Sequence, residues 1–228
     1  MSIYAIIAAA GRGKRMGGAI NKQFLEIENR PILVHTLEKF CQCELIDGIV
    51  IVVPEDWYLY VRANIVDKFK IKKIKKIVII GTTRQDSIYK VLKVVDKHVS
   101  TVVIHDAVRP LISLELLIKV IHKGKETGAA VLAIPLLESI KKVTNNQIAH
   151  TINRDSVWLV QTPQVYNRDV ILHAYQQAFV NRTTATDDSE LVEHSGYPIE
   201  VVEGDRMNIK ITNQQDLELA TILMQKSY

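Results

Sequence analysis

Short apolar runs alternate along this chain with segments whose apolar residues recur at helical spacing. The β-rich runs cover residues 3–9, 49–53, 77–80, 102–105 and 130–134. Helical spacing connects Val34, Leu37 and Phe40 after Pro31, recurs in residues 84–97, and relates Leu114, Leu117, Ile118 and Ile121. This alternation predicts an α/β fold with a mostly parallel, Rossmann-like sheet and helices on both faces.

The rhythm breaks between residues 137 and 160. Two short alternating segments, 139–143 and 147–152, flank the turn-forming Thr144-Asn145-Asn146 and predict a β-arm inserted into one domain that spans residues 1–228. An arm this small has no core of its own, so we expect it to pack against a second subunit. Strands at 199–202 and 209–212 and a last helix capped by Asn213 should complete the fold.

Composition narrows the classes of function. The 228 residues are 47% apolar and 24% charged, as in ordinary globular domains, and no apolar run has the roughly 20 residues of a membrane span. The net charge of +4 comes largely from four lysines between residues 72 and 76, which we interpret as a solvated helix end and not as a nucleic-acid surface. Met1-Ser2 leads directly into the first strand, so we expect a cytoplasmic protein.

The segment from Ala8 to Met16 follows the first strand and carries two glycines with three cations, Arg12, Lys14 and Arg15. Small residues let the backbone approach a ligand, and successive N–H groups can point at phosphate oxygens. The segment lacks the third glycine of the dinucleotide fingerprint and the Ser or Thr that follows Gly-Lys in a P-loop. Its charge density favours a triphosphate site over a simple basic turn.

Other polar residues follow later strands, where parallel sheets bind ligands. The third strand leads into Gly81-Thr82-Thr83-Arg84-Gln85-Asp86-Ser87, in which Asp86 or Ser87 taken singly indicates a helix cap. The fourth leads into Asp106, followed by Arg109-Pro110. A carboxylate in that position can hold Mg²⁺ together with substrate phosphates. The alternative is a structural ion pair between Asp106 and Arg109.

The chain resembles the 2-C-methyl-D-erythritol 4-phosphate cytidylyltransferases of the non-mevalonate isoprenoid pathway. The resemblance rests on segments that follow one another along nearly the whole chain: AAAGRGKRM, KQFLEI, RPILVHTL, RQDS, HDAVRP, WLVQTPQ, ATDDSELVE and NIKIT. It implies that CTP and methylerythritol phosphate are joined with release of pyrophosphate, that Mg²⁺ is the cofactor, and that the enzyme is a homodimer built through the arm.

The resemblance also implies roles for individual positions. Catalytic cations match Arg15, Lys22 and Lys210, and the carboxylate that binds magnesium matches Asp106. Nucleotide-binding positions match Ala9, Ala10, Gly11, Gly13, Gly81, Thr82, Ser87 and Asp106. Substrate-side positions match Arg109, Ser139 and Arg154, of which the last two would reach the neighbouring subunit's site.

Some positions depart from the family pattern. Thr82 replaces a glycine that often follows Gly81, and Ser139 replaces the usual threonine. Asp205 lies earlier than the second acidic residue of some members, and a loop carboxylate that caps the next turn explains it nearly as well.

Three other functions compete with this interpretation. Ribitol 5-phosphate cytidylyltransferases share the fold and differ in the acceptor, but Ala107 and the pair Asp187-Asp188 favour the methylerythritol branch. A nucleotide sensor without chemistry would not need Arg15, Lys22, Asp106 and Lys210 together. A dinucleotide-dependent oxidoreductase would need a glycine where Met16 stands.

Overall fold

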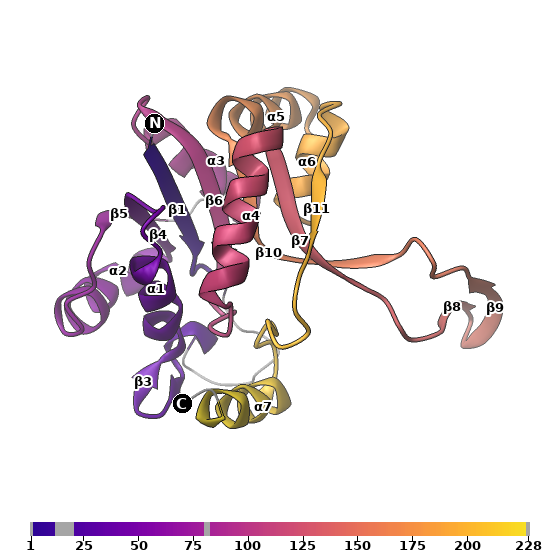
Figure 1. The fold of residues 1–228 in the computed structure, drawn as a ribbon, viewed down its shortest axis with the longest axis horizontal. Helices are drawn as coiled ribbons and strands as arrows, with labels where there is room; N and C mark the ends of the chain where they lie inside the picture. Colours follow the sequence, from indigo (N-terminus) through magenta and orange to yellow (C-terminus); the bar gives the residue numbers. More distant parts are fainter. Residues whose placement is uncertain (1, 12–20, 80–82, 227–228) are drawn as a thin grey trace.

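A twisted sheet lies at the centre of the computed structural model, which describes residues 2–11, 21–79 and 83–226. Its strand order is β11-β7-β10-β6-β1-β4-β5 (Figure 1). All neighbouring strands pair in parallel except β10, which is antiparallel to both β6 and β7. The strands are β1 (Ser2–Ala8), β4 (Gly48–Val53), β5 (Ile74–Ile79), β6 (Val99–Asp106), β7 (Ala129–Pro135), β10 (Trp158–Asn167) and β11 (Glu200–Glu203).

Helices cover both faces of the sheet. One apolar core lies between the sheet and the helices α1 (Ile32–Gln42), η4 (Val61–Asp67, a π-helix that continues α2, Tyr58–Tyr60) and α4 (Leu114–Thr127). The opposite core lies under α3 (Arg84–Val94), α5 (Arg168–Asn181) and α6 (Asp188–His194). The predicted mostly parallel sheet with helices on both faces is therefore confirmed.

The last helix, α7 (Gln214–Gln225), packs on a third, smaller apolar cluster instead of on the sheet. Its partners include Ile27, which belongs to the short hairpin of β2 (Glu26–Ile27) and β3 (Arg30–Pro31), and Ile32, which follows that hairpin. Asn213 and Asp216 form a capping box, so the predicted cap is confirmed and fixes where α7 begins.

The β-arm extends away from the sheet (Figure 1). Its strands β8 (Ile140–Thr144) and β9 (Gln147–Ile152) form a separate two-stranded sheet, joined by Asn145 and Asn146 in the left-handed conformation with φ of 51° and 61°. Asn tolerates this conformation, which a two-residue hairpin turn requires. The arm's apolar side chains are largely exposed, with Val143 at 58% and Ile148 at 66%.

Some local predictions are wrong. Residues 209–212 form no strand: the Ile211 N–H donates to the Val108 carbonyl at 2.9 Å, and within the described ranges this segment pairs with no strand. Lys75 and Lys76 lie on the edge strand β5 and not on a helix end, and charged side chains on an edge oppose pairing with other chains. Pro31 is the residue before α1 and not in its first turn.

Strand β10 is an addition to the predicted sheet. It begins at Trp158, inside the segment assigned to the arm, and lies in the sheet between β6 and β7.

In the described ranges, no helix has both the length and the apolar character needed to cross a membrane.

Candidate active site

A cleft of about 930 Å³ opens at the carboxyl ends of β1, β4, β5 and β6. These strands are neighbours in the sheet, so the segments that follow them meet at one edge. The lining residues come from the ends of those strands and from two distant segments: Ala8, Ala10, Gly11, Lys22, Gln23, Pro54, Glu55, Asp56, Ile79, Thr83, Arg84, Ser87, Lys90, Asp106, Val108 and Lys210.

Asp106 is the last residue of β6 and is the centre of a cluster of charges. Lys210 Nζ lies 2.8 Å from its Oδ2 atom, and Arg109 Nε lies 3.8 Å from the same oxygen. Burial by itself raises the pKa of Asp106, but the charges of Lys210, Arg84 and Arg109 outweigh it and lower that pKa to about 2. Asp106 is therefore a carboxylate at neutral pH, and the alternative ion pair with Arg109 is present in addition to the contact with Lys210.

A ring of contacts holds this cluster. The Asp106 N–H donates to Thr162 Oγ1 at 3.1 Å, and the Thr162 carbonyl accepts from Asn208 Nδ2 at 2.9 Å. The Asn208 carbonyl in turn accepts from Arg109 Nη1 at 2.6 Å, and the ion pair between Arg109 and Asp106 closes the ring. Asn208 lies two residues before Lys210, so strand β10 and the C-terminal loop together set where the charges lie.

His105 lies behind the cleft with its ring completely buried. Its Nε2 donates to the Arg109 carbonyl at 3.1 Å, and the ring packs against Phe40 with centroids 4.9 Å apart. Burial is the largest influence and lowers the pKa of His105 to about 4, so the ring is neutral at physiological pH. A neutral His105 orients the Arg109 turn without adding charge.

Lys22 and Gln23 bring a distant segment to the opening of the glycine-rich loop. Lys22 is the first residue of a 3₁₀ turn, η2 (Lys22–Phe24), and lines the cleft. Its side chain lies close to the Gly11 backbone, because a Cβ atom added to Gly11 would be 3.9 Å from Lys22 Cε. Gln23 is buried, and its Nε2 donates to the Ala9 carbonyl at 2.6 Å. This bond fixes Lys22 beside the end of β1.

The first turn of α3 forms another wall. Thr83 and Asp86 make a reciprocal capping box, which confirms the cap expected for Asp86. Ser87 lines the cleft, is buried, and donates its hydroxyl to the Thr83 carbonyl at 2.6 Å. Arg84 also lines the cleft and is paired with the buried Asp188 of α6.

The structure places those predicted site residues that it describes in three groups. Lys22, Lys210, Ala10, Gly11, Ser87 and Asp106 line the cleft, while Ala9 and Arg109 support it from behind. Ser139, just before β8, and Arg154, just after β9, are exposed and do not line this chain's cleft. Arg15, Gly13, Gly81 and Thr82 lie outside the described residues.

The donors present fit magnesium but not a metal held by the protein alone. Among the residues that the structure describes, no group of three His, Cys, Asp or Glu side chains could hold an ion. Asp106 supplies one ionised carboxylate, and Mg²⁺ commonly takes one or two carboxylates and completes its shell with substrate phosphates and water. Asp205 instead accepts the Met207 N–H at 2.8 Å, as expected of a turn cap.

Comparison with known proteins identifies the family. The model of the IspD family, 2-C-methyl-D-erythritol 4-phosphate cytidylyltransferase, matches residues 3–226. The chain belongs to this family. The curated cytidylyltransferase of Syntrophus aciditrophicus is 42% identical over 98% of this chain and 96% of its own length, and that of Clostridium botulinum strain Langeland is 41% identical over 97% and 96%.

Solved structures agree with this cytidylyltransferase fold. The 4-diphosphocytidyl-2C-methyl-D-erythritol synthase of Anaerococcus prevotii superposes with a TM-score of 0.85 at 32% identity, covering 98% of this chain and 96% of that one. The 2-C-methyl-D-erythritol 4-phosphate cytidylyltransferase of Francisella tularensis gives 0.82 at 33%, covering 97% and 99%. The protein is a nucleotidyltransferase of isoprenoid biosynthesis, and nothing in these matches supports the ribitol alternative.

The sequence alone assigned no role to four residues that line this cytidylyltransferase site or support it: Gln23, Arg84, Thr162 and Asn208. Each lies inside a segment that carries the family resemblance, namely KQFLEI, RQDS, WLVQTPQ or NIKIT. Their partners are distant in the sequence, as with Arg84 and Asp188, so the segments alone could not indicate which contact each side chain makes.

Proposed function

We propose that the cleft binds CTP and 2-C-methyl-D-erythritol 4-phosphate and joins them into 4-diphosphocytidyl-2-C-methyl-D-erythritol. The observation that carries this proposal is the convergence of Lys22, Lys210 and the ionised Asp106 on one cleft at the carboxyl edge of the sheet. A polyanionic substrate needs fixed cations and a site for a metal ion, and Lys22, Lys210 and Asp106 bring these together from three distant parts of the chain.

The acceptor phosphate supplies its own nucleophile. A phosphate monoester has a second pKa of about 6, so its oxygen is an anion near neutral pH and needs no general base. That oxygen forms a new bond to the α-phosphorus of CTP while the bond to the β-phosphate bridging oxygen breaks, and pyrophosphate leaves with the electron pair. The main difficulty is repulsion between the two anions. In the transition state the negative charge is spread over the phosphoryl oxygens.

Fixed cations reduce this repulsion. Two opposite unit charges 4 Å apart attract by about 4 kcal/mol at an effective dielectric constant of 20, so each well-placed cation can lower the barrier appreciably. Lys22 is the candidate for the phosphates next to the Gly11 backbone, and Lys210 for those near Asp106. By family resemblance Arg15 would add a third cation. Lys210 exchanges its contact with Asp106 for one with substrate.

Mg²⁺ is the proposed cofactor, and Asp106 would hold it. When bound, the ion would neutralise phosphate charge and align the triphosphate. The low pKa of Asp106 keeps this carboxylate available without prior loss of a proton. Thr162 and Asn208 keep its backbone in place through the ring of contacts around it.

We further propose a cytoplasmic homodimer built through the arm. Arm residues such as Val143, Ile148 and Ile152 are exposed and apolar, as expected of a surface that a second subunit covers. Ser139 and Arg154 would then reach the polyol phosphate in the neighbouring cleft.

Two experiments test these proposals. Pyrophosphate release from CTP is measured with a panel of polyol phosphates, with and without Mg²⁺; faster turnover of ribitol 5-phosphate, or full activity after removal of divalent ions by a chelator, contradicts the acceptor or the cofactor. A second assay mixes the inactive variants Lys22→Ala and Arg154→Ala after refolding together. If clefts and arms are shared, mixed dimers hold one intact site and recover about a quarter of wild-type activity, whereas no recovery rejects the shared site.

A further inference from the structure

Arg84 has features of a ligand-binding residue that the proposed reaction does not use. It is the first residue of α3, lines the cleft, and has 37% of its side chain exposed. Its partner Asp188 is completely buried and does not line the cleft. The guanidinium therefore lies between a buried carboxylate and the space where substrate binds.

Two donors hold that carboxylate. Arg84 Nη2 donates to Asp188 Oδ2 at 2.6 Å, and the Tyr175 hydroxyl donates to Asp188 Oδ1. Burying a carboxylate costs several kcal/mol unless its partners are well placed, so Asp188 holds the arginine firmly. The charge of Asp188 raises the pKa of Arg84 above its ordinary value, and the side chain is always a cation. The second acid of the ATDDSELVE segment thus orients a residue of the cleft.

The remaining donors of Arg84 are available to a ligand. A guanidinium carries five N–H donors in a rigid fork, and Asp188 is the hydrogen-bond partner that it has among the described residues. Its field reaches the centre of the site, because Arg84 is among the charges that lower the pKa of Asp106. Arg84 therefore shares the cleft with Ser87 and with the proposed metal carboxylate, Asp106.

We propose that Arg84 binds an oxygen of the nucleotide's α-phosphate, and that Asp188 and Tyr175 are positioning residues that aim it. The α-phosphate is the group at which the nucleophile attacks, and arginine binds phosphate oxygens through paired N–H donors. This inference rests on the proposed nucleotide reaction, since it assigns Arg84 to the substrate of that reaction.

The test compares three ligands that differ only in phosphates. Binding of cytidine, CMP and CTP is measured by calorimetry and by ligand-observed NMR for wild type, Arg84→Gln and Arg84→Lys. Loss of one charged hydrogen-bond pair should weaken CMP and CTP binding to Arg84→Gln by about tenfold to a hundredfold and leave cytidine binding unchanged. Arg84→Lys keeps the charge without the fork and should fall between.

Arg62→Gln is the matched control. Arg62 is also paired with an aspartate, 3.5 Å from Asp67, but it lies outside the cleft lining, and its loss should change no ligand's affinity. Asp188→Asn should weaken CMP binding less than Arg84→Gln does, while cytidine binding stays unchanged. Thermal unfolding checks that each variant is folded.

The outcomes separate the possibilities. Equal weakening of all three ligands means a purely structural arginine, and weakening of CTP alone means contact with the β- or γ-phosphate; either result overturns the assignment, as does unchanged CMP binding. Failure of the wild type to bind CTP instead overturns the proposed function itself.

Discussion

The buried, neutral His105 predicts a specific loss of stability in mild acid. In an unfolded chain a histidine has a pKa of about 6.5, whereas burial lowers that of folded His105 to about 4. Between these values the unfolded chain binds a proton that the folded protein does not bind. The contribution of neutral His105 to the free energy of unfolding is therefore complete above pH 6.5 and is lost as the pH falls toward 4.

The size of the loss follows from these two values. At pH 5 the unfolded chain's His105 is nearly all protonated and the folded ring is nearly all neutral, which corresponds to about 2 kcal/mol, rising to about 3 kcal/mol below pH 4. The variant His105→Gln keeps an amide donor for the Arg109 carbonyl and does not titrate. Its free energy of unfolding should fall by about 2 kcal/mol less than that of the wild type between pH 7 and pH 5.

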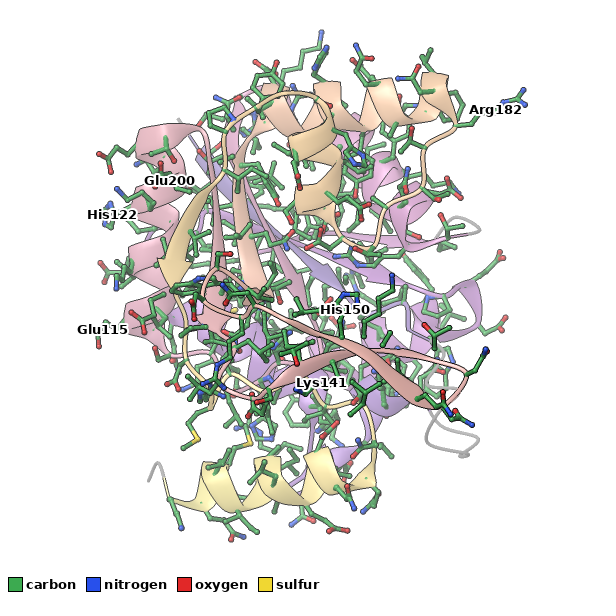
Figure 2. The ribbon with its side chains drawn as sticks, turned by 90° about the vertical axis from the view of Figure 1, so that its right-hand side faces the viewer. Glu115, His122, Lys141, His150, Arg182 and Glu200 are labelled. Atoms are coloured by element: carbon green, nitrogen blue, oxygen red, sulfur yellow. The ribbon has the colours of Figure 1, made fainter. Side chains whose placement is uncertain are left out.

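Urea unfolding followed by tryptophan fluorescence measures the loss in the free energy of unfolding between pH 7 and pH 5 for the wild type and for His105→Gln. Carboxylates titrate in both proteins, so their contribution cancels in the comparison. His122→Gln is the control, because His122 is exposed on α4 (Figure 2) and its replacement should leave the wild-type pH dependence unchanged. If wild type and His105→Gln lost equal stability, the ring would not be held neutral by burial, and the account of the Arg109 turn would be wrong.

Three further substitutions test other parts of the structure. Lys22→Ala should leave the fold intact and lower kcat by roughly 10² to 10³, as when one transition-state donor is removed; near-normal turnover in the pyrophosphate assay would show a misassigned cation. Thr162→Val leaves the buried Asp106 N–H without its acceptor and should cost about 1 to 3 kcal/mol in urea unfolding, with a drop in kcat; unchanged values would mean that the ring positions nothing. Gly124→Ala places a Cβ 2.5 Å from Val165 Cγ1 and 2.7 Å from Val165 Cβ, so strand β10 must shift, and the substitution should cost about 1 to 3 kcal/mol in urea unfolding. An unchanged free energy of unfolding would show that α4 and β10 are not packed this closely.

The sequence predicts the sheet and its helices because their signals are local. Apolar runs of strand length and helical spacing are visible in any short window, and caps such as Asn213 before α7 add to them. The 209–212 segment has the same alternating apolar pattern but no neighbouring strand, so the same signal gave a wrong strand there. Local patterns predict which segments can pair and not whether a partner is near.

The sequence predicts only those site residues that lie at or directly after the ends of parallel strands. Asp106, Ser87 and Gly11 are indicated in this way, because carboxyl ends of parallel strands meet at one edge. Lys22 and Lys210 were found through family resemblance, since no rule of spacing relates them to β6. The contacts that support these residues, from Thr162 and Asn208, depend on which distant segments pack together.

The reversed direction of β10 explains how one strand serves both the arm and the site. An antiparallel strand begins at the edge where its parallel neighbours end, so β10 starts at Trp158 opposite Pro135, the last residue of β7. The chain can therefore leave β7 for the arm and return at the same edge as the cleft. The strand then carries Thr162 to the Asp106 backbone within a few residues. A parallel strand would begin at the opposite edge, and the arm would be far from the charges it is proposed to complete.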